Sequence, residues 1–349
     1  MKEIFQAESD TIKKLSVLIP LYNSENTIVD LVDNVITTLH ANFNVLEIII
    51  VNDGSLDNSH FYALQVVKKH PGIVKYIRLA RNFGEHNAIM CGLNHVTGDC
   101  VAIIDDDFQN PPSEILKLVS KLHEDYDVVY SYYAQKHHSW FRNLGSFFND
   151  WVATKLLKKP KGLYLSSFKV ISYPMVRTII QYKGPYPYID GIILRSTRSI
   201  GRQLCMHEDR KIGRSNYTLS KLMHLWINMA TGFSITPLRI ASVIGILMSI
   251  FAVLLTVFFI VSRLAGGLFI KQHIPVGWAS LIITITFFSG LQLCVLGLIG
   301  EYLGRLFLMM NRLPQYVVSG TYGLKEPQSN ENAKQSSNST SLRNENAGS

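Results

Sequence analysis

Three consecutive aspartates, Asp105-Asp106-Asp107, are the residues of this sequence with the clearest capacity for chemistry. They follow the apolar run Val101 to Ile104, which predicts a buried strand, and Pro111-Pro112 comes shortly after them. Carboxylates this close repel each other. A Mg²⁺ or Mn²⁺ ion would relieve the repulsion, because both ions prefer carboxylate oxygens and bridge to substrate phosphates. Asp105 and Asp107 point to the same side of an extended segment, which suits shared coordination. An acidic turn that caps the next helix is the alternative.

The elements that must position this triplet alternate between strand and helix. Strands are expected at Leu15 to Ile19, Leu46 to Val51, Val74 to Leu79, Val101 to Ile104 and Asp127 to Tyr132. Helices are expected at Glu25 to His40, Asp57 to Lys69, Glu85 to Val96 and Ser113 to Glu124. Alternation with short links predicts an α/β fold with a mostly parallel, doubly wound sheet.

Polar residues follow each of the first four predicted strands, where the ligands of such sheets bind. They are Asn23 and Glu25, Asp53, Arg81 and Asn82, and the aspartate triplet. The first strand is not followed by the glycine pattern of dinucleotide-binding folds, and the chain has no P-loop motif. The strand ends therefore predict one ligand site that is neither a nicotinamide site nor a P-loop.

Composition points towards a membrane. Of the 349 residues 47% are hydrophobic, and the mean hydropathy is +0.14 with a pI of about 9.2. A net charge of +8 suits either nucleic acid or anionic lipid. Much of the excess charge lies near apolar segments, so no nucleic-acid partner is expected. The four cysteines are scattered, which argues against a zinc site and a disulfide framework.

Two uncharged apolar runs, Ile240 to Val261 and Val276 to Gly300, are long enough to cross a bilayer and predict a helical hairpin. Basic residues flank its outer ends, which places both flanks in the cytoplasm. Two earlier stretches, His137 to Leu157 and Tyr217 to Phe233, are amphipathic. They predict interfacial helices, and ordinary core-facing helices are the alternative.

These patterns divide the chain into four parts. Residues 1–214 are expected to form a cytoplasmic catalytic domain and 215–237 a juxtamembrane amphipathic helix. Residues 238–308 would hold two transmembrane helices, at about 240–261 and 276–300. Residues 309–349 would be a cytoplasmic tail, disordered after about residue 324. The N-terminus has no signal-peptide core. The expected location is the inner, cytoplasmic membrane, with several spans and both termini in the cytoplasm.

Several motifs together resemble a known family. They are Pro20 to Glu25, Val51 to Ser55, Arg81 to Gly84, Asp105 to Pro112, Arg210 to Tyr217, Phe233 to Arg239 and Gly300 to Arg305. The chain resembles the family 2 glycosyltransferases with a GT-A fold over residues 13 to 320. Within them it is similar to the polyprenyl-phosphate branch, which includes dolichyl-phosphate mannose synthase, bactoprenol glucosyltransferase and undecaprenyl-phosphate aminoarabinose transferase.

The resemblance implies roles for matching residues. The base, ribose and diphosphate of a nucleotide-sugar would contact Pro20, Tyr22, Glu25, Asp53, Arg81, Asn82, Asp105 and Asp106. A Mg²⁺ or Mn²⁺ ion would be held by Asp105, Asp107 and Gln109, and the acceptor phosphate by Arg210, Arg214 and Ser215. Catalysis would depend on Asp105, Asp107 and Arg210. Asp190 is the best spare carboxylate; it could act as a base, bind a sugar hydroxyl or cap a turn.

Two positions depart from the family pattern. Where many relatives have an arginine after a central strand, this chain has Tyr133, with Lys136 as the nearest cation. Where many relatives have an aspartate that is proposed as the base, this chain has serine in Ser166-Ser167. A serine hydroxyl is no general base near neutral pH without a partner. A phosphate monoester is largely a dianion near pH 7, so we expect the acceptor to be nucleophilic without a protein base.

The resulting hypothesis is a metal-dependent, inverting transferase. It would move a single sugar from a UDP- or GDP-linked donor to a polyprenyl (undecaprenyl) phosphate at the cytoplasmic face, for modification of cell-envelope glycans. Relatives imply a homo-oligomer. A processive polysaccharide synthase is one alternative, but it would need more spans and a Gln-x-x-Arg-Trp motif that this chain lacks. A non-catalytic lipid-binding membrane protein on the same fold is another.

Overall fold

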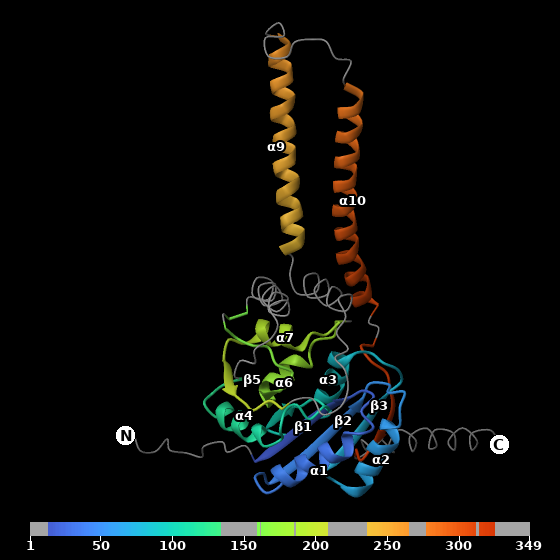
Figure 1. Cartoon of the computed structure of the whole chain (residues 1–349), viewed down its shortest axis with the longest axis vertical. Helices are drawn as coiled ribbons and strands as arrows, with labels where there is room; N and C mark the ends of the chain where they lie inside the picture. The colour runs from blue at the N-terminus through green and yellow to red at the C-terminus, as the bar shows by residue number, and fades with distance from the viewer. Residues whose placement is uncertain are drawn as a thin grey trace, which may run out of the picture.

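The computed structural model describes residues 13–133, 159–160, 162–184, 186–208, 236–264, 277–311 and 314–324. Figure 1 shows an α/β domain from which two long helices project, α9 (Thr236–Leu264) and α10 (Gly277–Met310). The two predicted amphipathic stretches lie outside the described residues. So do three residues with implied roles, Arg210, Arg214 and Ser215.

The described residues form one eight-stranded sheet in the order β7-β5-β6-β4-β1-β2-β3-β8. Its strands are β1 (Lys14–Leu21), β2 (Val45–Asn52), β3 (Val74–Leu79), β4 (Cys100–Ile103), β5 (Val128–Tyr132), β6 (Lys169–Ser172), β7 (Ile200–Leu204) and β8 (Val318–Tyr322). The helices of this domain are α1 (Ile28–Leu39), α2 (Ser59–Lys69), α3 (Glu85–Leu93), α4 (Glu114–Leu122), α6 (Tyr173–Ile179) and α7 (Ile189–Ser196).

The predicted parallel arrangement is confirmed for the first four strands. β1 lies between β2 and β4 and is parallel to both, and β2 is parallel to β3. Two later strands are antiparallel and were not predicted: β6 lies between β4 and β5, and β8 pairs with β3. Parallel neighbours end at the same edge of a sheet. The polar residues after β1 to β4 therefore meet along one edge, here called the carboxyl edge.

Helices cover both faces of the sheet (Figure 1). Alternate residues of β1 point to opposite faces. Val17 belongs to the apolar layer that includes residues of α1, α2 and α4, and Leu18 to the layer that includes residues of α3, α6 and α7. Burial on both faces explains why these strands appear in the sequence as continuous apolar runs rather than as alternating patterns.

The apolar segments after the α/β domain form long helices. α10 continues to Met310, beyond the predicted end at Gly300, and Glu301 and Arg305 form an i,i+4 ion pair of 2.8 Å within it. Over the described residues, Phe287–Met310 is long and apolar enough to cross a membrane, with a mean hydropathy of 1.7, and its most apolar window is not buried in the protein. α9 contributes a shorter apolar segment, Leu238–Met248.

Candidate active site at the carboxyl edge of the sheet

Asp53, the residue after β2, clamps the loop that follows β3. Its carboxylate is buried, and its two oxygens accept hydrogen bonds from the backbone N–H groups of Phe83 (2.7 Å) and Gly84 (2.8 Å). Burial raises the pKa of Asp53, although these two bonds oppose the rise. Two motifs that lie about thirty residues apart in the chain are thus joined at the carboxyl edge.

Gly54 allows these two loops to touch. Its φ is +66°, and a Cβ built on it would lie 2.4 Å from the carbonyl carbon of Arg81. A side chain would therefore push the loops apart, and glycine is required here. Arg81 and Asn82 are exposed on the outer side of this junction, and the Arg81 guanidinium lies 4.7 Å from the centre of the Phe83 ring.

Asp106 holds the turn after β1. One of its oxygens accepts hydrogen bonds from the backbone N–H of Tyr22 (3.2 Å) and from the hydroxyl of Ser24 (2.6 Å). Burial raises the pKa of Asp106 to about 6, and the neighbouring carboxylates of the triplet add to the rise. Sequence reasoning did not single out Ser24, because its link to Asp106 spans more than eighty residues.

The other residues expected near the nucleotide lie around this turn. Pro20 is buried within β1, and Tyr22 is 41% exposed. Glu25 accepts a hydrogen bond from the backbone N–H of Asn58 (2.9 Å), and its own N–H donates to Asp57 (3.1 Å). The turn after β1 is thereby fixed against the start of α2. An exposed aromatic ring remains on its surface, where a flat base could stack.

Asp105 lies near two residues that come from different parts of the chain. The hydroxyl of Ser167, near the start of β6, donates a hydrogen bond to Asp105. Glu85, the first residue of α3, lies close enough that its charge contributes to raising the pKa of Asp105 well above the usual range, after burial as the main cause. Sequence reasoning missed Glu85, although it directly follows the Arg81 to Gly84 motif.

Asp190 is buried at the start of α7, where it forms an ion pair with the buried Lys169. Its Oδ1 accepts hydrogen bonds from the hydroxyl of Tyr130 (2.8 Å) and from the ammonium of Lys169. Lys169 is itself only 2% exposed and lies 5.1 Å from the Tyr130 ring centre. Sequence reasoning missed this partner. A role for Asp190 as a base remains a prediction, and it would require the carboxylate to act while paired with Lys169.

His86 lies in the first turn of α3, beside this pair. Its ring packs edge-on against Tyr188, with the ring centres 5.1 Å apart. Burial lowers the pKa of His86 to about 4, so the ring is neutral near pH 7. Among the described residues its buried Nδ1 has no hydrogen-bond partner. It is therefore a candidate contact for a polar group of a bound ligand.

Tyr133, the first departure from the family pattern, lies in a network of neutral side chains with Ser166, the neighbour of Ser167. Tyr133 donates a hydrogen bond to the side-chain oxygen of Asn110 (2.7 Å), and its hydroxyl lies 3.1 Å from that of Ser166. Ser131 donates to Ser166 at 2.8 Å. The turn after the triplet is further held at Gln109, whose amide nitrogen lies 3.4 Å from Nε2 of His207. Hydroxyl and amide groups thus support the acidic turn without added charge.

The chemistry of the donor set fits a hard divalent cation. Asp105 and Asp107 supply carboxylate oxygens, and Gln109 supplies an amide group in the same turn. Burial first, and then the neighbouring carboxylates, raise the pKa values of Asp105 and Asp106, so negative charge is unfavourable here and a cation would offset that cost. Within the described ranges no three His, Cys, Asp or Glu side chains are grouped as ligands. Two carboxylates completed by water and substrate phosphates are typical of Mg²⁺.

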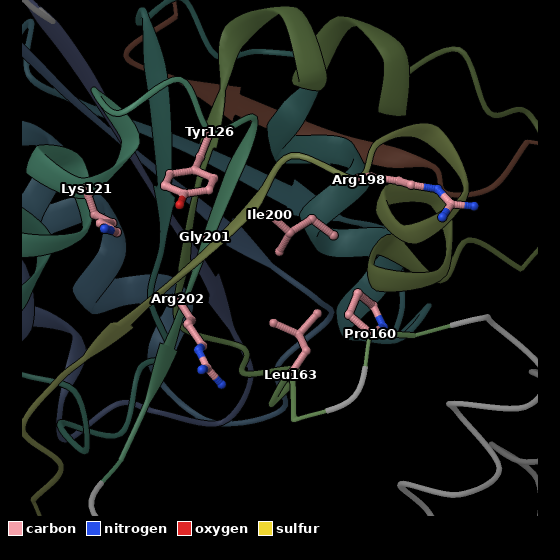
Figure 2. A pocket seen from close by; sticks show the side chains of 8 residues that line it. All are labelled: Lys121, Tyr126, Pro160, Leu163, Arg198, Ile200, Gly201 and Arg202. Atoms are coloured by element: carbon pink, nitrogen blue, oxygen red, sulfur yellow. The ribbon is translucent and has the colours of Figure 1, made fainter.

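A separate cavity of about 430 Å³ opens at the start of β7 (Figure 2). Its lining includes the cationic side chains of Lys121, Arg198 and Arg202 beside Tyr126. β7 is parallel to β5, and β6 runs antiparallel to both β5 and β4, so the start of β7 lies at the edge opposite the triplet. This cavity is therefore not part of the acidic site.

Comparison with known proteins shows similarity over nearly the whole chain. Residues 16–178 match the family described as glycosyl transferase family 2. The chain is 33% identical over 322 residues to the undecaprenyl-phosphate 4-deoxy-4-formamido-L-arabinose transferase of Proteus mirabilis, covering 92% of this chain and 98% of that protein. It is 32% identical over 314 residues to the protein of the same name from Serratia proteamaculans, covering 90% and 95%.

Among solved structures, the chain is similar to glucosyl-3-phosphoglycerate synthase from Mycobacterium tuberculosis in complex with Mn²⁺, uridine diphosphate and glucosyl-3-phosphoglycerate. The sequence identity is 19% and the TM-score 0.48, and the match covers 63% of this chain and 78% of that chain.

Proposed function

Since the chain belongs to glycosyl transferase family 2 and is a glycosyltransferase, we propose that it transfers a single sugar from a nucleotide-sugar to a polyprenyl phosphate. The observation that supports this acceptor is the alignment of at least 90% of the chain, α9 and α10 included, with relatives named undecaprenyl-phosphate sugar transferases. The product would supply lipid-linked sugar for modification of cell-envelope glycans.

The donor nucleotide would bind along the carboxyl edge. Tyr22 offers an exposed ring on the turn that Asp106 holds, and Asp53 keeps the Arg81 to Gly84 loop beside it. Pro20 and Glu25 shape the rim of this turn, and Arg81 and Asn82 present donors to ribose or phosphate oxygens. We propose that this arrangement selects a UDP- or GDP-linked sugar.

The diphosphate would lie against the triplet. Asp105, Asp107 and Gln109 would hold a Mg²⁺ or Mn²⁺ ion, which when bound neutralises charge on the departing diphosphate. Ser167 holds the Asp105 carboxylate in place by donating a hydrogen bond to it. Glu85, the first residue of α3, lies close enough to this carboxylate for its charge to raise the pKa of Asp105.

The acceptor phosphate would attack without a protein base. One of its oxygens forms the bond to the anomeric carbon while the bond to the nucleotide diphosphate breaks, which inverts the configuration. Arg210, Arg214 and Ser215 would bind the phosphate, because paired guanidinium donors match its oxygens. The active-site residues therefore act mainly by position and charge.

The pairing of β8 with β3 supports a topology in which the chain crosses the membrane twice. β8 follows α10 in the chain and pairs with β3 of the catalytic sheet, so it lies on the same side of a membrane as that sheet. The chain between the two strands must then cross an even number of times. α10 can cross once, which leaves α9 for the return crossing. We propose a cytoplasmic catalytic domain (1–214), a juxtamembrane helix (215–237), two spans within 238–308 and a cytoplasmic C-terminal segment (309–349).

Cysteine labelling tests this topology. In a variant without native cysteines, Gln272→Cys lies between the spans and is expected to react with an impermeant reagent added to intact cells. Asn330→Cys lies beyond α10 and is expected to react only after the membrane is opened. Labelling of Asn330→Cys from outside would refute the two-span arrangement.

A panel of donors tests the proposed reaction. The purified protein is incubated with undecaprenyl phosphate, Mn²⁺ and radiolabelled UDP- or GDP-sugars, and the product is extracted into organic solvent. One donor class is expected to give a lipid with a single sugar, and excess EDTA is expected to stop the reaction. A polymeric product would favour a processive synthase, and no transfer from any donor would contradict an enzymatic role.

Asp53→Asn is expected to raise the KM for the donor about tenfold to a hundredfold. The amide puts an N–H₂ group where one carboxylate oxygen now accepts a backbone hydrogen bond, and a hydrogen bond to a charged group contributes roughly 1.5–3 kcal/mol. The Arg81 to Gly84 loop would lose part of its anchor. Asp125→Asn, in an exposed turn before β5, is a matched control. An unchanged KM in Asp53→Asn would contradict this role of the clamp.

A further inference from the structure

The residues that follow α10, 314–324, return to the catalytic domain and are here called the C-terminal strap. Its strand β8 pairs with β3 from Tyr76 opposite Tyr322 to Leu79 opposite Val318. The pairing extends beyond β3, because the backbone N–H of Ala80 donates to the carbonyl of Val317 (2.8 Å). Ala80 directly precedes Arg81. The strap therefore holds the chain where it enters the loop clamped by Asp53.

A second contact of the strap reaches α3. Tyr316 is half-buried against the apolar layer that includes α3, and its hydroxyl lies beside the side chains of Cys91 and Asn94. Glu85 and His86 lie at the other end of this helix, near Asp105 and Asp190. A rigid helix transmits its position along its length, so anchoring one end also places the other.

A third contact reaches the connection between α6 and α7. The side-chain N–H₂ of Gln315 donates to the carbonyls of Tyr182 (3.1 Å) and Gly184 (2.6 Å). In the same region the guanidinium of Arg305, in the last turns of α10, lies 5.3 Å from the centre of the Tyr186 ring. This connection leads directly into α7 and Asp190.

The far end of the strap is also fixed. Tyr322 stacks on Tyr76 with the ring centres 5.6 Å apart, and Leu324 packs against the buried core. Gly323 has a φ of +73°, and a Cβ there would lie 2.6 Å from the carbonyl oxygen of Val74. Only glycine fits this approach. The strap is thus held to the catalytic domain near both of its ends.

We propose that the C-terminal strap is a positioning element of the active site, which ties the membrane helix α10 to three segments that carry or adjoin residues of the candidate active site. These segments are the Arg81 to Gly84 loop, α3, and the connection that leads to Asp190. The inference rests on the proposed function, in which the acceptor phosphate is confined to the bilayer surface. The donor must then be held at a set height and orientation, because misplacement by about 1 Å can cost roughly a hundredfold in rate.

The test uses the full-length chain in lipid nanodiscs. The double variant Gln315→Ala/Tyr316→Phe removes the polar contacts to α3 and to the α6–α7 connection, but leaves the aromatic ring and the β8 pairing. Its kcat/KM for glycosylation of undecaprenyl phosphate is expected to fall about tenfold, because a small displacement of the segments at the active site slows transfer. The variant is expected to stay folded with a melting temperature lowered by roughly a few degrees, and amide hydrogen exchange of residues 81–87 is expected to become faster.

The matched control, Gln203→Ala/Tyr126→Phe, makes the same two replacements in β7 and just before β5. β7 is the strand at the other end of the sheet order from β8, and the control is expected to retain full activity. Wild-type kcat, KM and exchange in the strap variant would overturn the inference. If the double variant unfolds, Gln315→Ala alone decides by the same three measurements. If the wild-type chain transfers no sugar to the lipid, the proposed function is refuted. If the wild type is active and the strap variant is unaffected, only the proposed positioning role of the strap is refuted.

Discussion

Asp107→Asn is expected to abolish sugar transfer, with kcat at least a hundredfold to a thousandfold lower, as is typical when one preorganised charge-stabilising group is lost. The substitution removes a charged ligand from the triplet. The fold should survive, because an asparagine keeps the oxygen that accepts the hydrogen bond from the backbone N–H of Gln109 (3.1 Å). It also lowers the repulsion with Asp105 and Asp106.

Three measurements on Asp107→Asn separate chemistry from folding. They are kcat at saturating donor and lipid, Mn²⁺ affinity by calorimetry, and the melting temperature. Asp30→Asn removes an exposed carboxylate from the first turn of α1 and is the matched control. Loss of both kcat and Mn²⁺ affinity at an unchanged melting temperature is the expected result. Full activity, or undiminished wild-type turnover in excess chelator, would contradict a metal role for the triplet.

Arg210→Ala is expected to lower kcat about a hundredfold or more. Two negative groups, the acceptor phosphate and the leaving diphosphate, approach each other during transfer, and a guanidinium that holds either one stabilises the transition state. Arg210 lies outside the described residues, so this expectation rests on the sequence motif. The measurement is kcat with saturating donor and undecaprenyl phosphate.

Two further variants show whether a protein base competes with this explanation. Ser167→Ala is expected to keep most of its turnover, because the Ser167 hydroxyl only donates a hydrogen bond to Asp105 and the acceptor phosphate, largely a dianion near pH 7, needs no base. Asp190→Asn breaks a buried ion pair and leaves Lys169 uncompensated, so its melting temperature must be measured as well. A loss of several orders of magnitude in a folded Asp190→Asn, rescued at high pH, would establish a base and refute the argument.

The sequence alone was sufficient for the parallel half of the sheet. Continuous apolar runs bounded by polar residues can be buried on both faces only in a sheet covered by helices. The strand ends Asp53, Arg81 and Asp105 therefore had to share one edge, whatever the details of packing. Periodicity also located the helices closely, with α2 ending at Lys69 and α3 beginning at Glu85 as expected. These features depend on local pattern, which a sequence displays directly.

The tertiary structure decided which of these residues touch. Asp53 could have faced a ligand alone, but it binds the backbone of Phe83 and Gly84. Ser167, at a position where a base was expected from relatives, instead donates to Asp105 across sixty-two residues of chain. Such partners follow from the order of the strands and the insertion of β6 beside β4. No local periodicity encodes that order.

The same holds for β8. Its five residues, Val318 to Tyr322, carry no alternating apolar pattern and were assigned to a tail segment. The strand exists because β3 would otherwise be an open edge, and unpaired backbone groups at an edge favour pairing with any segment that can reach them. α10 delivers the segment to that edge. A strand whose stability comes largely from its partner, through backbone pairing and the contact of Tyr322 with Tyr76, becomes visible only when the chain is folded.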